Sequence, residues 1–225
     1  MTTLDAINAR HAVRKYIDKA LPTETVSVLT EEINTCNAEG GLHIQLAVNE
    51  PRAFDGFMAH YGSFSGVKNY IALIGKKNAG LDEKAGYYGE RIVLKAQALG
   101  LNTCWVAMSF SKGPVRSGCT VGPGEKLVCV ISLGYGETQG VPHRSKPINA
   151  LYSADSEIPG WFLSGVEAAA LAPTAVNQQK FRFILNGSDV KCQNLGGPYS
   201  KVDLGIAEYH FDIGSGRNIF GPGIN

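Results

Sequence analysis

Residues 167–185 read EAAALAPTAVNQQKFRFIL, which places a helix-forming run, a short polar loop and an alternating strand in succession. The opening alanines and leucine favour a helix, because they lose little side-chain freedom in that conformation. After the loop, Phe181, Phe183 and Leu185 recur at every second position, which is the period of a strand. The stretch therefore predicts one helix–loop–strand unit, with a helix over 161–171 and a strand over 181–185.

The same plan occurs once more, nearer the N-terminus. Residues 32–48 read EINTCNAEGGLHIQLAV, in which Gly40-Gly41 ends a helix predicted over 23–36 and a strand follows over 42–48. A tyrosine-containing turn and a hydrophobic element follow each copy. Self-similarity of this kind is typical of a duplicated chain, although a shared helix–loop–strand plan also arises by chance. We therefore predict two halves, residues 1–150 and residues 151–225, which form a pseudo-dimer within one chain.

Other apolar runs predict the remaining elements. Short, nearly all-apolar runs at 70–75 and 127–133 are typical of strands that are buried on both faces. Further helices are predicted over 3–14, 86–100 and 204–213, from helix-forming composition and apolar spacing. Glycines and prolines between 134 and 159 predict a long surface connection.

The composition excludes several classes of protein. The chain has 225 residues, of which 44% are hydrophobic and 18% charged, so it is expected to fold. Its net charge of +1 gives no basic excess for nucleic acid or an anionic membrane surface. It has no apolar run of about 20 residues and no secretory N-terminus. Its five cysteines show no CxxC spacing, which indicates reduced thiols and a cytoplasmic protein.

Three segments carry groups that could bind a ligand. In RHAVRKY, residues 10–16, Arg10 and Arg14 would share one face of a helix and suit a phosphate. The small residues and amides of 172–181 allow close approach to a flat polar ring. Arg144 and Lys146 add two cations in a loop after a buried strand. Each segment alone is also typical of a solvated basic surface or an ordinary turn.

Taken together, the three segments resemble the nitroreductase family. RHAVRKY resembles the R-R-S-x-R-x-F start of these proteins, and APTAVNQQKF resembles their A-P-S-x-x-N-x-Q-P-W loop. GLNTCW, VCVISLGY and RSKP resemble the family's helix end with its tryptophan segment, its strand and its closing Arg-x-x-P element. The resemblance covers most of the chain. It implies an α+β fold with a mixed, mainly antiparallel sheet sandwiched by helices.

The order of the motifs departs from the ordinary family, where the A-P-S loop lies shortly after the arginine motif and meets it across a homodimer interface. Here the matching loop is displaced to position 172, so the resemblance is to a divergent branch with an internal pseudo-dimer. His11 and Ala12 replace Arg and Ser, and Lys180 and Phe181 replace Pro and Trp. The missing serine hydroxyl bears on the affinity for the cofactor more than on the fold.

The resemblance implies an FMN site assembled from both ends of the chain. In it, Arg10, Arg144 and Lys146 neutralise the phosphate and Arg14 lies near the pyrimidine end of the ring. Backbone amides at Ala107 and Met108 are candidates to bond flavin N5. The implied cofactor-binding residues are Arg10, His11, Ala12, Arg14, Ser63, Ala107, Met108, Arg144, Lys146, Pro173, Thr174, Ala175 and Asn177.

The implied activity is that of an FMN-dependent NAD(P)H oxidoreductase, which passes hydride through the flavin to a nitroaromatic, quinone or similar small acceptor. No catalytic side chain and no metal are needed, since the flavin carries the chemistry. A monomer could bind FMN, and the sequence does not exclude a homo-oligomer. The alternatives are a non-catalytic FMN-binding protein, or a related chemistry such as reductive dehalogenation or the use of flavin as substrate.

Three other interpretations fit the sequence poorly. Gly134, Gly136 and Gly140 give the spacing GxGxxxG, and Pro142 follows where a dinucleotide-binding helix should begin. GSFSG at 62–66 lacks the GxSxG pattern of a serine hydrolase. The five histidines show no metal-ligand spacing, so they are interpreted as structural or surface residues.

Overall fold

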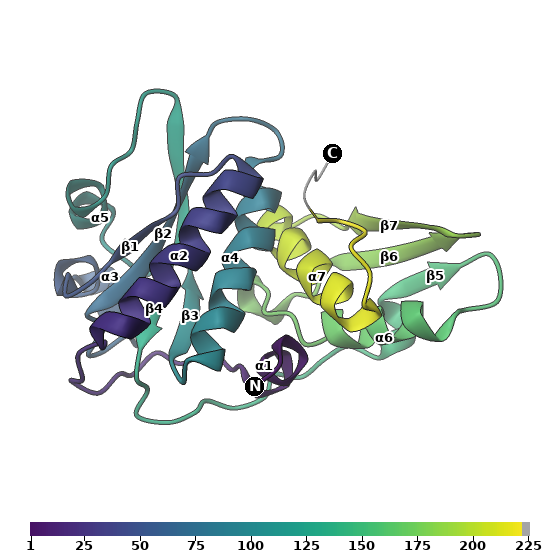
Figure 1. The fold of residues 1–225 in the computed structure, drawn as a ribbon, viewed down its shortest axis with the longest axis horizontal. Coiled ribbons are helices and arrows are strands. Elements are labelled where there is room, and N and C mark those ends of the chain that lie inside the picture. Colours follow the sequence, from purple (N-terminus) through teal and green to yellow (C-terminus); the bar gives the residue numbers. More distant parts are fainter. Residues whose placement is uncertain (222–225) are drawn as a thin grey trace.

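The computed structural model describes residues 1–221 and contains two β-sheets, each covered by helices (Figure 1). Helix α4 (Leu81–Ala98) lies on the first sheet and α7 (Ser200–Ser215) on the second, and the two helices pack against each other. The largest apolar cluster runs through both helices and both sheets. The two predicted halves therefore share one continuous core.

The first sheet is four-stranded and antiparallel throughout, in the order β1-β2-β4-β3. Its strands are β1 (Gln45–Ala47), β2 (Asn69–Lys76), β3 (Asn102–Val106) and β4 (Glu125–Gly134). Along β2, Tyr70, Ala72 and Ile74 face one apolar cluster while Ile71 and Leu73 face the other. The prediction of strands buried on both faces is confirmed for β2.

Helices cover both faces of this sheet. Helix α2 (Thr23–Gly40) and α4 lie on one face, and α2 ends at Gly41, whose φ of 61° is the left-handed cap that glycine adopts at least cost. The other face packs against the short helices η1 (Pro51–Ala53), α3 (Phe57–Tyr61) and α5 (Lys112–Gly118). The cavity described below is lined by residues of both apolar clusters, such as Cys104 and Val106 of one and Trp105 and Cys129 of the other.

The second sheet is three-stranded and has the order β5-β6-β7. Strand β6 (Phe181–Asn186) pairs in parallel with β5 (Tyr152–Ala154) and antiparallel with β7 (Asp189–Asn194). Helix α6 (Gly160–Ala169) packs on α7, and η2 (Ile148–Ala150) and η3 (Ala175–Asn177) are single turns. The α+β class with mainly antiparallel strands is thus confirmed, although the strands form two sheets.

The two parts of the chain share an order of main elements, with the short helices η1 and α3 inserted between β1 and β2 and the turn η3 between α6 and β6. Helix α2, strands β1 and β2 and helix α4 follow each other as α6, β6, β7 and α7 do. A side chain added at Gly86 of α4 would collide with the carbonyl of Val202, and one at Gly205 of α7 would collide with that of Glu83. The two contacts exchange when Gly86 is matched with Gly205 and Glu83 with Val202. Paired contacts of this kind are typical of a two-fold interface.

The predicted boundary at residue 150 lies between η2 and β5, and residues 222–225 of the second half lie outside the described part of the chain. Within residues 1–221, none of the helices combines the length and the apolar character that crossing a membrane requires.

Candidate functional site

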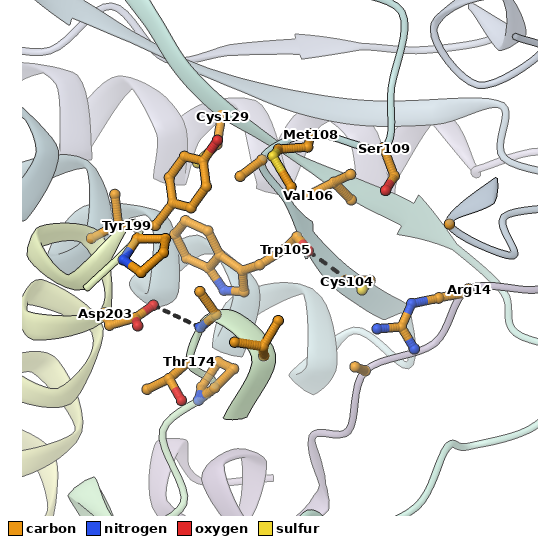
Figure 2. A pocket seen from close by; sticks show the side chains of 18 of the residues that line it. Arg14, Cys104, Trp105, Val106, Met108, Ser109, Cys129, Thr174, Tyr199 and Asp203 are labelled. Carbon is orange, nitrogen blue, oxygen red and sulfur yellow. Dashed lines mark hydrogen bonds between the residues drawn. The ribbon is translucent and has the colours of Figure 1, made fainter. Parts of the chain in front are cut away.

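A cavity of about 510 Å³ opens between the first sheet and the start of α7 (Figure 2). Its volume lies in the range of roughly 300–1,000 Å³ that is typical of small-molecule sites. Segments from both predicted halves line it. The lining residues are Arg10, Ala12, Arg14, Tyr61, Gly62, Ser63, Phe64, Cys104, Trp105, Val106, Ala107, Met108, Ser109, Cys129, Pro173, Thr174, Ala175, Val176, Pro198, Tyr199, Val202, Asp203 and Ile206.

The arginine segment reaches the cavity as an extended chain, and the prediction of a helix over 3–14 is wrong in its second half. Helix α1 (Thr3–Ala9) ends before Arg10, whose φ and ψ of −74° and 121° are extended. Ala12 then bridges Thr103 of β3, and the amide of Val13 donates to the Thr103 carbonyl at 3.0 Å. Pairing with the strand overrides the local helical preference.

The extended conformation also decides which side chains face the cavity. Alternate residues of an extended chain point to the same side. Arg10, Ala12 and Arg14 therefore all line the cavity, whereas Val13 is buried in the core. His11 lies on the other side, against Gly140, and is not among the lining residues. Its imidazole has a lowered pKa, because burial and then the charge of Arg10 disfavour the protonated form.

Arg10 is a buried cation without a full complement of partners. Its side chain is 4% exposed, and its Nε lies 3.6 Å from Oε1 of Glu90, outside hydrogen-bonding distance. The same Oε1 lies 2.9 Å from Nε2 of His210, while Oε2 accepts a 2.8 Å hydrogen bond from the indole of Trp105. Glu90 is therefore occupied by other donors, and Arg10 Nε has no hydrogen-bond partner in the described chain.

The second arginine lies on the opposite side of Trp105 from Thr174 and Asp203 (Figure 2). The guanidinium of Arg14 lies 6.0 Å from the centroid of the Phe64 ring, within the range of a cation–π contact. Cys104 lies beside it in the wall. Burial raises the pKa of the Cys104 thiol, more than the charges of Arg14 and Arg10 lower it. The thiol is thus protonated and forms a neutral part of the lining.

The loop after α6 forms the wall contributed by the second half. Pro173, Thr174 and Ala175 line the cavity, and Val176 lies beside them with 92% of its surface exposed. The amide of Ala175 donates to Oδ1 of Asp203 at 2.9 Å, so α7 supports the loop from behind. Burial raises the pKa of the Asp203 carboxyl to about 6, against the effect of hydrogen bonds from Gln178 and Ala175.

Three of the predicted residues support this loop and do not line the cavity. The exposed Asn177 turns its side-chain nitrogen to the carbonyl of Arg144 at 2.9 Å. Lys146 donates from Nζ to the carbonyl of Gln179 at 2.7 Å, and the Arg144 side chain is exposed. The structure thus brings Arg144, Lys146 and Asn177 together beside the loop. Their predicted contacts with a cofactor stay a prediction.

The remaining predicted residues do line the cavity. Ala107 and Met108 follow Val106, the last paired residue of β3, and line the cavity just beyond the strand. Ser63 lies in the turn after α3 with a φ of 62°, an unusual conformation for a serine. The dinucleotide-binding alternative is contradicted at Gly134–Gly140, since no helix follows β4 there.

Sequence reasoning missed several residues that shape the site. Glu90 and His210 are buried on α4 and α7, and neither has a motif around it. Gln179 is 2% exposed and matches the second amide of the family's N-x-Q pattern, which is the one signal that could have identified it. Tyr199 and Asp203 line the cavity because α7 begins at Ser200, four residues before the predicted helix. Among residues 1–221, no group of three or more His, Cys, Asp or Glu side chains is placed to hold a metal ion.

Comparison with solved structures supports the architecture. A "putative nitroreductase" from Thermotoga maritima is 22% identical with a TM-score of 0.65, over 94% of this chain and 82% of that one. A "putative nitroreductase in complex with FMN" from Desulfovibrio desulfuricans is 22% identical with a TM-score of 0.56, over 71% and 99%. A "putative NADH dehydrogenase/NAD(P)H nitroreductase" from Bacteroides thetaiotaomicron is 19% identical with a TM-score of 0.51, over 66% and 94%. At these identities the likeness shows the fold.

No curated protein matches the chain. The family model described as "Putative TM nitroreductase" matches residues 2–215, which is nearly the whole sequence. The motifs, the α+β fold and this match agree, and the chain belongs to that nitroreductase family.

Proposed function

We propose that this protein is an FMN-dependent NAD(P)H oxidoreductase whose flavin site is the cavity between the two halves. The observation that carries the proposal is Arg10, a 4%-exposed cation in the cavity wall whose Nε has no hydrogen-bond partner. A buried guanidinium is stable only when its charge and its donors are satisfied. An anionic group on a bound ligand would supply a hydrogen-bond acceptor to Arg10 Nε, which Glu90, at 3.6 Å, does not.

The rest of the lining fits a flat, partly apolar ligand that carries a phosphate. Arg10 and Arg14 supply two cations, spaced along one side of an extended segment. Pro173, Thr174 and Ala175 bring backbone close to the cavity from the other half, and Ala107 and Met108 line it just beyond the last paired residue of β3. This is the usual composition of a cofactor pocket, in which apolar walls hold a few converging polar groups.

When bound, FMN would take hydride from a nicotinamide nucleotide and deliver it to a small acceptor such as a nitroaromatic or a quinone. The protein would hold and orient the flavin and exclude water. Arg14 would stabilise negative charge at the end of the ring system nearest to it. No residue is required to act as a nucleophile, in keeping with the protonated Cys104 thiol.

We further propose that the two halves form an internal pseudo-dimer, so that one chain suffices for one site. The matched order of elements and the exchanged contacts of Gly86 and Gly205 support this proposal. A monomer is then expected to retain FMN. The five free cysteines of the described chain fit a reducing compartment, and we propose a cytoplasmic location.

The proposal is tested with the purified protein, mixed with FMN, passed through gel filtration and examined by visible absorption. About one flavin per chain is expected. Arg10→Ala should weaken FMN binding about 10- to 100-fold, the value of a hydrogen bond to a charged group. Arg10→Ala also removes the buried ion pair with Glu90, in which Nε lies 3.6 Å from Oε1, so the melting temperature of the FMN-free variant is measured beside its FMN affinity. Arg182→Ala, which removes an exposed arginine from β6, is the charge-matched control.

A protein that refuses FMN, or an Arg10→Ala variant with the parent's affinity, would contradict the proposed site. Steady-state oxidation of NADH and NADPH with a nitroaromatic or a quinone then tests turnover. Background rates with FMN fully bound would leave the alternative, a flavin-binding protein without reductase activity.

A further inference from the structure

The indole of Trp105 is held in the cavity wall by one helix. Trp105 lies on β3, and its Nε1 donates to Oε2 of Glu90 on α4 at 2.8 Å. A Cβ at the neighbouring Gly89 would lie 2.5 Å from Cη2 of the indole. The ring therefore packs directly on the α4 backbone at Gly89, and the adjacent Glu90 fixes its N–H. Two consecutive residues of α4 thus set the position of the Trp105 side chain. This side chain lies among the residues that line the cavity (Figure 2).

Glu90 is also tied to the second half of the chain. It is fully buried, and its Oε1 lies 2.9 Å from Nε2 of His210 on α7. The other ring nitrogen of His210 lies 3.0 Å from the carbonyl of Ala168, which can only accept, so this Nδ1 carries a proton. His210 is held on both sides and holds Glu90 in turn. The carboxylate cannot rotate towards Arg10 without losing the His210 contact.

We propose that Glu90 is a positioning residue of the cavity, which fixes the Trp105 indole through its accepting oxygen and ties this wall to α7 through His210. A buried indole N–H without an acceptor is costly, so without Glu90 the ring would move to find another partner. This inference rests on the proposed function only in taking FMN as the ligand beside Trp105.

The experiment uses Trp161→Phe as the parent, which makes Trp105 the only tryptophan, since the chain has two. Trp161 lies on α6 outside the cavity lining. Near-ultraviolet circular dichroism and fluorescence anisotropy then report the fixation of Trp105 without FMN. Flavin affinity is measured separately by fluorescence titration, so the positioning and the cofactor are tested independently.

Two substitutions at position 90 separate the hydrogen bond from the charge. Glu90→Met keeps the length of the side chain and removes both acceptors; we expect it to lose more than half of the Trp105 dichroism and to weaken FMN about tenfold. Glu90→Gln keeps an amide oxygen that can accept from the indole, and should retain both signals within about twofold. The control is Glu208→Gln, a carboxyl on α7 that is also buried and lies outside the cavity lining.

An unchanged Trp105 signal in Glu90→Met would overturn the proposal, and so would an equal loss in Glu208→Gln. If Glu90→Met does not fold, Trp105→Phe, which keeps a ring and deletes the N–H, must weaken FMN binding, and unchanged affinity there overturns it. A parent that binds no FMN, with the Trp105 signal still lost in Glu90→Met, would uphold the positioning role and refute the proposed function.

Discussion

The loop after α2 and the loop after α6 occupy the same place in the helix–loop–strand plan, yet they are built in different ways. The first is short and turns through Gly41, the residue type that adopts a left-handed φ at least cost. Asn37 completes it, with its side-chain amide bonded to both backbone groups of Ile44 at 2.9 and 2.7 Å. None of these residues lines the cavity.

The second loop takes the same left-handed conformation without glycine. Val176, Asn177 and Gln179 have φ values of 48°, 54° and 44°. Each non-glycine residue in this region costs about 1–3 kcal/mol, and the cost is highest for a branched side chain such as Val176. The hydrogen bonds of Gln179 and Asp203 offset this strain. Strain that surrounding structure maintains is characteristic of ligand-contacting segments, and the difference between the loops therefore supports the proposal that the second loop contacts the cofactor.

The largest expected effect comes from removing the side chain that holds the second loop. The Gln179 amide accepts from the Lys146 amide at 2.7 Å and donates to the Arg144 carbonyl and to Asn177, both at 2.8 Å. Gln179→Ala deletes these three bonds and should destabilise the protein by about 3 kcal/mol. Because the loop lines the cavity, FMN affinity should also fall, by about 100-fold, as measured by fluorescence titration.

The matched control lies in the first loop. Asn37→Ala deletes two hydrogen bonds and should cost about 2 kcal/mol, with no change in FMN affinity. Urea unfolding and flavin titration of both variants decide the comparison. Equal losses of affinity in the two variants would mean that general destabilisation, and not the loop, weakens the flavin.

A second, smaller effect should appear in the pH dependence of stability. The folded-state pKa of Asp203 is about 6, above the ordinary value of 3.8. Between these values the folded protein keeps a proton that the unfolded chain has released. The free energy of unfolding should therefore fall as the pH rises from about 4 to 6, by up to about 3 kcal/mol for this group. Above pH 6 this contribution becomes constant.

Asp203→Asn should reduce this slope by the share that Asp203 contributes, measured as urea unfolding from pH 4 to 7. The control is Asp155→Asn, because Asp155 is exposed and its pKa is lowered, chiefly by a hydrogen bond from the Gly187 amide. That variant should keep the parent's slope between pH 4 and 6. Glu208, whose pKa burial raises to about 9, should leave a residual slope in both variants, so only a slope as steep as the parent's in Asp203→Asn would contradict the assignment to Asp203.

Much of the fold could be predicted from the sequence, in the places where the local sequence alone determines the conformation of a helix or strand. The run 70–75 is apolar at every position, and β2 is indeed buried on both faces. Gly41 ends α2 as its sequence indicates. Strand β7 was not predicted, because its residues are mostly polar. Its exposed and half-buried residues alternate along the strand. Local periodicity is weak in such an edge strand.

The site was predictable in its motifs and not in its geometry. Arg10 and Arg14 lie in the cavity, but through pairing with β3, which joins residues far apart in sequence. Glu90 and His210 interact across 120 positions, and no local pattern marks either of them. The extended arginine segment and the Glu90–His210 pair escaped prediction for the same reason. Contacts between segments distant in sequence override local preference and produce no periodic pattern in the sequence.

The smallest expected effect compares the two left-handed positions directly. Gly41 has open space around its α-carbon, so Gly41→Ala adds only the backbone strain and should cost about 1 kcal/mol. Val176→Gly relieves similar strain in the second loop, but glycine adds freedom to the unfolded chain. Because these effects oppose each other, the stability should change by less than about 0.5 kcal/mol. Urea unfolding measures the stability of the Gly41→Ala and Val176→Gly variants. A decrease above about 1 kcal/mol in the free energy of unfolding of Val176→Gly would show that this side chain, although 92% exposed, contributes packing. It would also contradict the backbone strain inferred for the second loop.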